Sequence, residues 1–123
     1  MTLRVSHSAP VFRSFDAALA RAFYVDWLQF DWEGEHRFHP GAPLYAFLRL
    51  GTFHLHLSEH HGDATPGSTA LVYVEGLRAF HAALPENPNM RPGLDLQPWG
   101  LEMSVTDPFG NRLRFLDQKE TAD

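Results

Sequence analysis

Two histidines at alternate positions of one short segment are the clearest metal-binding candidates in the sequence. In the run FHLHL, His54 and His56 alternate with the apolar residues 53, 55 and 57. Successive side chains of a β-strand point to opposite faces, so we expect both imidazoles on one face. Imidazole nitrogens bind zinc and related ions, which makes the pair a candidate metal site. No motif places a carboxylate or a third histidine beside the pair, so the favoured interpretation is the polar lining of a pocket.

Arg114 bears on what such a pocket could hold. It lies between Leu113 and Phe115, in a segment with β-strand character that follows the turn DPFGN. A guanidinium supplies hydrogen-bond donors and a permanent positive charge, and it has no lone pair for a metal. Facing a pocket, it would repel a divalent cation, more strongly where water is partly excluded. At a sheet edge it would simply extend to solvent, and the sequence leaves both interpretations open.

Several aromatic residues have the placement of ligand-contacting groups. Tyr45 and Phe47 are two residues apart on an expected strand, Phe38 lies in the loop before it, and Trp99 precedes a late strand. Flat rings stack on heteroaromatic ligands and attract cations at their faces. Glu102 is a candidate partner for a cationic group. For each of them a structural or solvent-exposed role is the alternative.

Composition limits the classes of function. The chain has 123 residues, 44% of them hydrophobic, which favours a single globular domain. Its net charge of −5 argues against nucleic acid as a partner. It contains no run of 18 apolar residues and no apolar signal core near its start, so we expect neither a membrane span nor secretion. The absence of cysteine fits a reducing cytoplasm.

The pattern of elements predicts an α+β fold. Asp16 is placed to cap a helix in which Leu19, Phe23 and Trp27 recur at helical spacing. The register of Trp27 with Phe23 predicts that Trp27 lies in the core. The sequence predicts a helix within 14–30, two strands within 43–60 that bend at 51–52, a strand within 68–77, a short helix within 76–85, a loop over 85–93, and two or three strands within 93–117. The order strand, helix, strands therefore occurs twice in one domain, over about 1–62 and 66–123.

Three stretches resemble one known family. AFYVDWLQF (22–30), YVEGL (73–77) and WGLEMSVTDPFGNRLRF (99–115) are similar to signatures of the vicinal oxygen chelate superfamily, also called the glyoxalase/bleomycin resistance/dioxygenase superfamily. The last stretch is the most specific, and the first departs at Gln29, where glycine is usual. The resemblance implies two βαβββ modules that form a cup-shaped mixed sheet.

The resemblance also implies four positions that hold a divalent cation in the catalytic members. Here these positions carry Ala9, His56, Thr69 and Arg114, of which only His56 could coordinate a metal. The chain therefore resembles the metal-free bleomycin resistance proteins, and we expect neither a metal nor another cofactor. A metal site built from His56 with His7 or His54 is the alternative.

The resemblance suggests a binding protein without catalysis. Tyr45 and Trp99 match the aromatics that flank the drug in bleomycin-binding proteins. The expected ligand-binding residues are Phe38, Tyr45, Phe47, His54, His56, Trp99, Glu102 and Arg114. We expect a homodimer whose clefts sequester a cationic aromatic glycopeptide of the bleomycin class or a similar ligand. The alternatives are a metal-dependent lyase, isomerase or dioxygenase of the same family, and a module that binds a metabolite.

Overall fold

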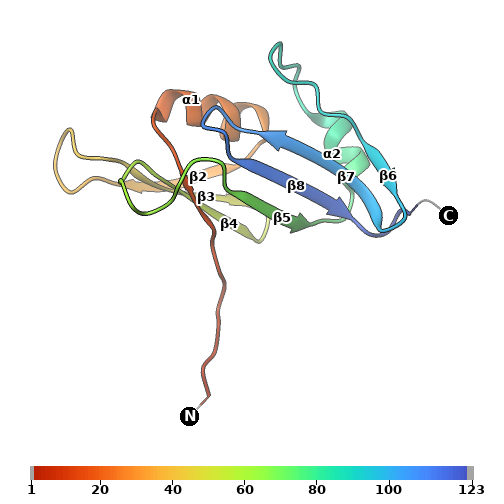
Figure 1. Ribbon diagram of the computed structural model, residues 1–123, viewed down its shortest axis with the longest axis horizontal. Coiled ribbons are helices and arrows are strands. Elements are labelled where there is room, and N and C mark those ends of the chain that lie inside the picture. The colour runs from red at the N-terminus through yellow and green to blue at the C-terminus, as the bar shows by residue number, and fades with distance from the viewer. Residues whose placement is uncertain (1, 122–123) are drawn as a thin grey trace.

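A computed structural model describes residues 2–121 of the protein. Over this range the chain runs twice through a strand, a helical segment and three further strands (Figure 1). The elements are β1 (Val11–Arg13), α1 (Ala17–Arg21), η1 (Ala22–Trp27), β2 (Asp31–His36), β3 (Tyr45–Leu50), β4 (Phe53–Ser58), β5 (Thr69–Tyr73), α2 (Leu77–Ala83), β6 (Asp95–Gln97), β7 (Gly100–Thr106) and β8 (Arg112–Asp117). This order confirms the α+β fold of two βαβββ modules.

Each module forms its own four-stranded mixed sheet. The strand orders are β1-β4-β3-β2 and β5-β8-β7-β6, so β1 and β5 are edge strands. In both sheets the first strand runs parallel to the last, and the other pairs are antiparallel. The registers correspond, because Val11 pairs with His56 in the first sheet and Leu71 pairs with Arg114 in the second.

The first helical segment confirms the expected helix with one correction. The carboxylate of Asp16 accepts a hydrogen bond from Leu19 N at 3.0 Å and so caps α1. Leu19, which the helical spacing groups with Phe23 and Trp27, does not share their buried face and is 51% exposed. The buried stripe instead follows the spacing of one helix face and consists of Ala20, Phe23, Tyr24, Trp27 and Leu28. Leu19 lies one position outside this stripe.

The segment ends in a wide turn and a residue of unusual backbone conformation. η1 is π-helical, and Leu28 N donates to Phe23 O five residues back. Gln29 then has φ of 69°, which makes it the single non-glycine residue with positive φ among residues 2–121. A left-handed residue at the end of a helix is usually glycine, because glycine has no Cβ to clash. The geometry therefore explains why glycine is usual at this position.

Strand β2 was not predicted from the sequence. Its residues, DWEGEH, are mostly polar, and a β-bulge shifts its register between Trp32 and Gly34. Trp32 lies on the helix side, with the Arg21 guanidinium 4.1 Å from its ring centroid. The other expected strands are confirmed, including the bend at 51–52 and three strands within 93–117.

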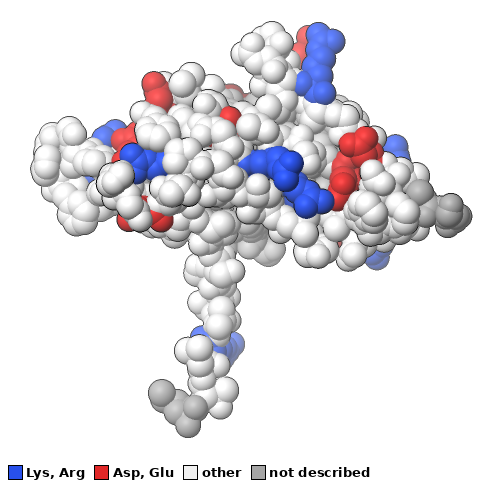
Figure 2. Space-filling model, in the orientation of Figure 1, with Lys and Arg blue, Asp and Glu red and all other residues white. Residues whose placement is uncertain are grey.

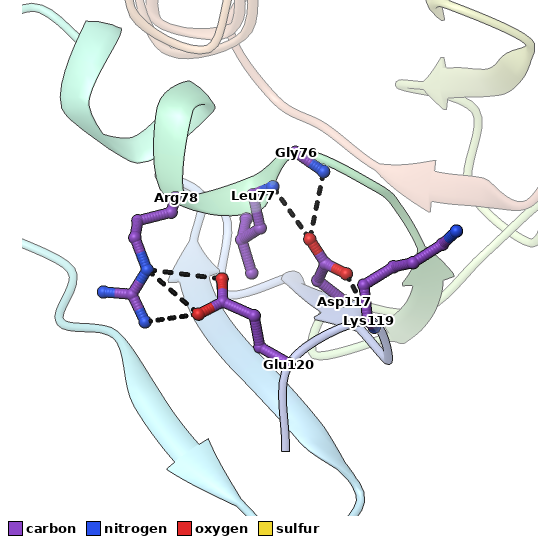
Figure 3. A network of polar contacts seen from close by, with 6 residues as sticks. All are labelled: Gly76, Leu77, Arg78, Asp117, Lys119 and Glu120. Carbon is purple, nitrogen blue, oxygen red and sulfur yellow. Dashed lines mark hydrogen bonds and ion pairs between the residues drawn. The ribbon is translucent and has the colours of Figure 1, made fainter.

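Helix α2 begins on a carboxylate from the end of the second sheet. Asp117 Oδ2 accepts hydrogen bonds from Gly76 N at 3.0 Å and Leu77 N at 3.1 Å (Figure 3). The pKa of Asp117 is lowered, first because Leu77 N–H donates to it and further by the N–H groups of Lys119 and Gly76. Helix α2 packs on the face of the second sheet that carries Leu113 and Phe115. The opposite face of this sheet stays open.

One hydrophobic core joins the two modules. Its cluster of buried residues draws on η1, β3 and β4 from the first module and on α2, β7 and β8 from the second. Tyr24 donates its hydroxyl to Asp107 Oδ2 at 2.6 Å, and Trp27 Nε1 donates to Pro85 O at 2.8 Å. Asn111 Nδ2 donates to Arg13 O at 2.7 Å. Trp27, expected in the core, is only 4% exposed.

The faces of the sheets away from this core are uncovered in a single chain. In Figure 1 the second sheet faces the viewer, and the N-terminal segment extends away from the body. Leu3 and Val5 in that segment are largely exposed. Among residues 2–121 there is no helix with the length and apolar character that a bilayer crossing would need.

Candidate functional site

The open face of the first sheet carries a cluster of aromatic and imidazole rings. Tyr45 and Phe47 project from β3 beside His56 of β4, while the alternate residues of β4, Leu55 and Leu57, are buried. The Tyr45 hydroxyl lies 2.8 Å from His56 Nδ1. The ring centroids of Phe47 and His56 are 4.9 Å apart at an interplanar angle of 82°. The alternation along β4 puts His54 and His56 on one partly exposed face, opposite Leu55 and Leu57.

The surroundings of His56 disfavour the charged form of its imidazole. Burial lowers its pKa, and the nearby imidazoles of His54 and His7 lower it further. The rings of His7 and His54 are stacked, with centroids 4.2 Å apart. The pKa of Tyr45 is raised, first by burial and then by the charge of Asp63, so its hydroxyl keeps its proton.

Phe38 lies at the margin of this surface. It is 76% exposed in the loop between β2 and β3, and its ring meets those of His36 and His60 edge-on at 4.7 and 5.9 Å. It makes no ring contact with Tyr45 or Phe47. Phe38 is therefore accessible but belongs to a separate group of rings at the end of the sheet.

The open face of the second sheet carries a linked polar and aromatic group. Glu102 of β7 accepts a hydrogen bond from Trp99 Nε1 at 3.1 Å and one from the Arg114 guanidinium at 2.6 Å. These two donors, Trp99 first, lower the pKa of Glu102. Trp99 is 53% exposed, so it is not a core residue. The carboxylate fixes both the indole and the guanidinium on the open face.

The four positions implied by the family resemblance have the same relation in both modules. Val11 pairs with His56 and Leu71 pairs with Arg114, so Ala9 and Thr69 each lie two residues before the partner of the β4 or β8 position. The alignment of the motifs is thus consistent between the modules. Apart from the imidazole of His56, these positions carry a methyl group, a hydroxyl and a guanidinium.

Metal-binding geometry is absent from the described part of the chain. Within residues 2–121, no three His, Asp or Glu side chains are grouped so that they could hold an ion. His54 and His7 are close to His56, but they stack on each other rather than converge with it.

Two further residues of the open face were not singled out from the sequence. Leu71 of β5 and Ser104 of β7 are the cross-strand neighbours of Arg114. Leu71 is 42% exposed. The strand alternation of Thr69, Leu71 and Tyr73 is the signal that could have identified this face of β5. Leu71 makes the surface around Arg114 partly apolar.

The two open faces are not connected within one chain. No hydrogen bond, ion pair or ring contact within residues 2–121 joins the group around His56 to the group around Arg114. Figure 2 shows basic side chains near the centre of the face seen in Figure 1, acidic ones beside them, and much uncharged surface.

A well-formed cavity lies away from both open faces. A half-open space of about 440 Å³ separates the β3–β4 turn from the end of β5 and from α2, and Phe53, Val72 and Phe80 are among its walls. None of the expected ligand-binding residues lines it. The expected site is therefore an open surface in the single chain rather than an enclosed pocket.

Comparison with solved structures supports the fold over nearly the whole chain. The bleomycin-binding protein of the bleomycin producer Streptomyces verticillus, in complex with copper(II)-bleomycin, has a TM-score of 0.68 at 25% identity, covering 94% of this chain and 98% of its own. TnmS3, an antibiotic-binding protein from Streptomyces sp. CB03234, has a TM-score of 0.68 at 18% identity, with coverages of 95% and 99%. A glyoxalase-related enzyme from Clostridium phytofermentans has a TM-score of 0.70 at 23% identity, with coverages of 94% and 97%.

Sequence comparison assigns the family. A comparison with curated proteins gives no match. The model of a family described as glyoxalase superfamily protein matches residues 2–122, and the motifs at 22–30, 73–77 and 99–115 all lie within this range. With the paired βαβββ modules, these findings show that the chain belongs to the glyoxalase superfamily.

Proposed function

We propose that this protein binds a cationic, aromatic small molecule of the bleomycin class, or a similar ligand, and sequesters it without chemical conversion. The ligand would lie against the open faces, between the rings of Tyr45 and Phe47 and the indole of Trp99. Support comes from the exposure of Phe47 and Trp99 and from the antibiotic-binding proteins among the structural neighbours.

The observation that carries this proposal is the ion pair of Arg114 with Glu102. Arg114 occupies the β8 position where catalytic relatives are expected to carry a coordinating glutamate. Its guanidinium donates to Glu102 at 2.6 Å, so the nearest carboxylate is already engaged. A divalent cation placed there would meet a fixed positive charge and no free carboxylate. Binding by ring contacts and hydrogen bonds remains available, and Trp99 can add a cation–π contact.

Calorimetric titration with metal-free bleomycin tests the proposal. We expect saturable binding to the unchanged protein and a loss of roughly tenfold or more in affinity for Trp99→Ala, because the ring supplies stacking and cation contacts. Leu96→Ala is the matched control, since Leu96 is also exposed and lies on the neighbouring strand β6. The absence of any heat of binding at high concentration would reject the bleomycin class as ligand.

We further propose that the binding clefts form in a homodimer. The two open faces are not joined within one chain, and the N-terminal segment exposes Leu3 at 86% and Val5 at 72%. A second copy could cover these apolar groups and bring one face of each kind together in two equivalent clefts. Sedimentation should give twice the mass of one chain, and Leu3→Ser combined with Val5→Ser should shift the protein toward monomer. A monomer at high micromolar concentration of the unchanged protein would contradict this proposal.

The alternative function is a metal-dependent enzyme of the same superfamily. The closeness of His7, His54 and His56 favours it, as does the likeness to a glyoxalase-related enzyme. Elemental analysis of the purified protein separates the two functions. A divalent metal present at one equivalent per chain would support the enzyme.

We propose a cytoplasmic location, because a chain without cysteine suits a reducing compartment.

A further inference from the structure

The imidazole of His56 is held in one orientation by its neighbours on β3. The Tyr45 ring meets it at 5.3 Å and 74°, and the Phe47 ring meets it at 4.9 Å and 82°. The Tyr45 hydroxyl adds a hydrogen-bond contact of 2.8 Å to Nδ1. Within residues 2–121, Nε2 of His56 takes part in no hydrogen bond. One ring nitrogen is thus occupied, and the other is free for a ligand.

The direction of the contact with Tyr45 decides what the free nitrogen offers. A phenol is a stronger acid than the N–H of neutral imidazole, and an imidazole nitrogen is a stronger base than a phenol oxygen. The favoured arrangement therefore has the hydroxyl donating to Nδ1. A neutral imidazole that accepts at Nδ1 carries its proton on Nε2.

We propose that His56 is a specificity-determining residue that presents its Nε2–H to a neutral acceptor on the ligand, such as a ring nitrogen or a carbonyl oxygen. Tyr45 is the positioning residue that fixes this tautomer. The inference rests on the proposed function, because it concerns the same open face. It adds a chemical requirement, since a cationic ligand must also carry a neutral acceptor beside the ring that lies against Tyr45 and Phe47.

The requirement has a physical basis in the partial burial of His56. A donor that loses contact with water on ligand binding must be paired again, and a ligand without an acceptor leaves it unpaired. His56 should therefore discriminate between ligands that carry the acceptor and ligands that lack it. The same tautomer leaves no lone pair on Nε2, so in this state the imidazole is a donor and not a metal ligand.

Nitrogen NMR of protein labelled in its histidine rings tests the tautomer without any ligand. His56→Gln identifies the His56 signals among the eight histidines. We expect Nε2 to be protonated and Nδ1 to be unprotonated in the unchanged protein. Tyr45→Phe keeps the ring but removes the hydroxyl, and it should shift His56 toward a mixture of tautomers. A proton on Nδ1 in the unchanged protein would overturn the inference.

Two probes of nearly equal shape test the acceptor requirement. Quinoline has a neutral ring nitrogen at pH 8, whereas N-methylquinolinium has the same rings, a positive charge and no acceptor. We expect quinoline to move the His56 Nε2–H resonance and to bind roughly tenfold tighter, although overall charge favours the cation. The preference should disappear in His56→Ala and shrink in Tyr45→Phe. Equal affinities, or an unmoved resonance, would contradict the proposal.

The two proposals fail separately. If bleomycin does not bind but quinoline is preferred through His56, the proposed antibiotic function is wrong and the acceptor requirement stands. If bleomycin binds equally well to the unchanged protein and Tyr45→Phe, and neither probe is preferred, the acceptor requirement is wrong and the proposed function stands.

Discussion

Glu102 determines how Arg114 and Trp99 are arranged. Its carboxylate accepts from both side chains, at 2.6 and 3.1 Å, and so orients a cation and an indole on the same open surface. The spacing of residues 99 and 102 around the start of β7 allows this contact. Arg114 reaches Glu102 from the adjacent strand β8. Its own cross-strand partner on β7 is Ser104, two residues after Glu102. The arginine is therefore part of a surface group and not an isolated charge.

We predict that the backbone is strained at Gln29 and that glycine would relieve the strain. Its φ of 69° is costly for a residue with a Cβ, and its side chain is exposed. Replacement by glycine should raise the free energy of unfolding by about 1 kcal/mol, the typical cost of a left-handed non-glycine residue. Urea unfolding measures the difference. Gln29→Ala keeps the Cβ and serves as the control, and a Gln29→Gly protein no more stable than the unchanged one would contradict the strain.

Single residues were predicted unevenly from the sequence, for physical reasons. Strand alternation placed His54 and His56 on one face correctly, because a period of two allows only two faces. Leu19 shares the helical spacing of Phe23 and Trp27 but is exposed, because neighbouring positions of a helix differ by only 100°. The contacts of Trp99 and Glu102 depend on side-chain rotamers and a neighbouring strand, which a sequence pattern does not contain.

At the scale of elements, the closing hairpin depends on glycine at one position. Gly100 has φ of 149°, and a Cβ there would lie 2.8 Å from Asp117 O and from Leu116 Cδ1. Gly100→Ala should therefore lower the free energy of unfolding by about 3 kcal/mol through overpacking and backbone strain. Gly93→Ala is the matched control, since nothing lies within 4 Å of its Cβ position. Equal thermal midpoints for the two variants would contradict this account of the WG motif.

The start of α2 should be sensitive to pH through Asp117. Its pKa is lowered because Leu77 N–H, and then Lys119 and Gly76 N–H, donate to the charged form. A group with a lowered folded-state pKa stabilises the protein above its unfolded pKa of about 3.9 and loses this effect as pH falls through the folded value. The stability advantage over Asp117→Asn should therefore be full at pH 6 and shrink below pH 4.

Urea unfolding of both proteins from pH 6 to pH 3 measures this effect. Asp95→Asn is the control, because it replaces a carboxylate on an exposed position of β6. A difference between Asp117→Asn and the unchanged protein that stays constant over this range would contradict the charged cap.

The order of elements was predictable, and individual weak elements were not. Alternating apolar residues identify β3, β4, β5, β7 and β8, because each buries one face. β2 buries little, and its sequence contains three acidic residues and a glycine, so the local signal is absent. Its pairing with β3 depends on tertiary context.

At the scale of the molecule, we propose that the two modules unfold as one domain. Tyr24 of η1 donates to the buried carboxylate of Asp107, which also accepts from Phe109 N and Asn111 N. Tyr24→Phe should lower the free energy of unfolding by about 1–3 kcal/mol, because a hydrogen bond to a buried charged group is lost. Tyr73→Phe is the control, since Tyr73 is exposed and makes no hydrogen bond within residues 2–121.

The unfolding curves should retain a single transition when followed by fluorescence and by circular dichroism. Two separate transitions would show that the modules fold independently. The link between Tyr24 and Asp107 was invisible in the sequence, because 83 residues separate the two groups. The turn motif around Asp107 and Asn111 was recognised in the sequence. That it joins the two modules can be seen only in the folded structure.

The central claim is that the open faces hold an organic ligand without a divalent metal. Calorimetric titration of metal-free bleomycin into chelator-treated protein, with excess EDTA kept in the buffer, tests it most directly. We expect one bleomycin bound per chain in the presence of EDTA. No binding under these conditions, followed by binding once the protein has taken up one divalent ion per chain, would contradict it.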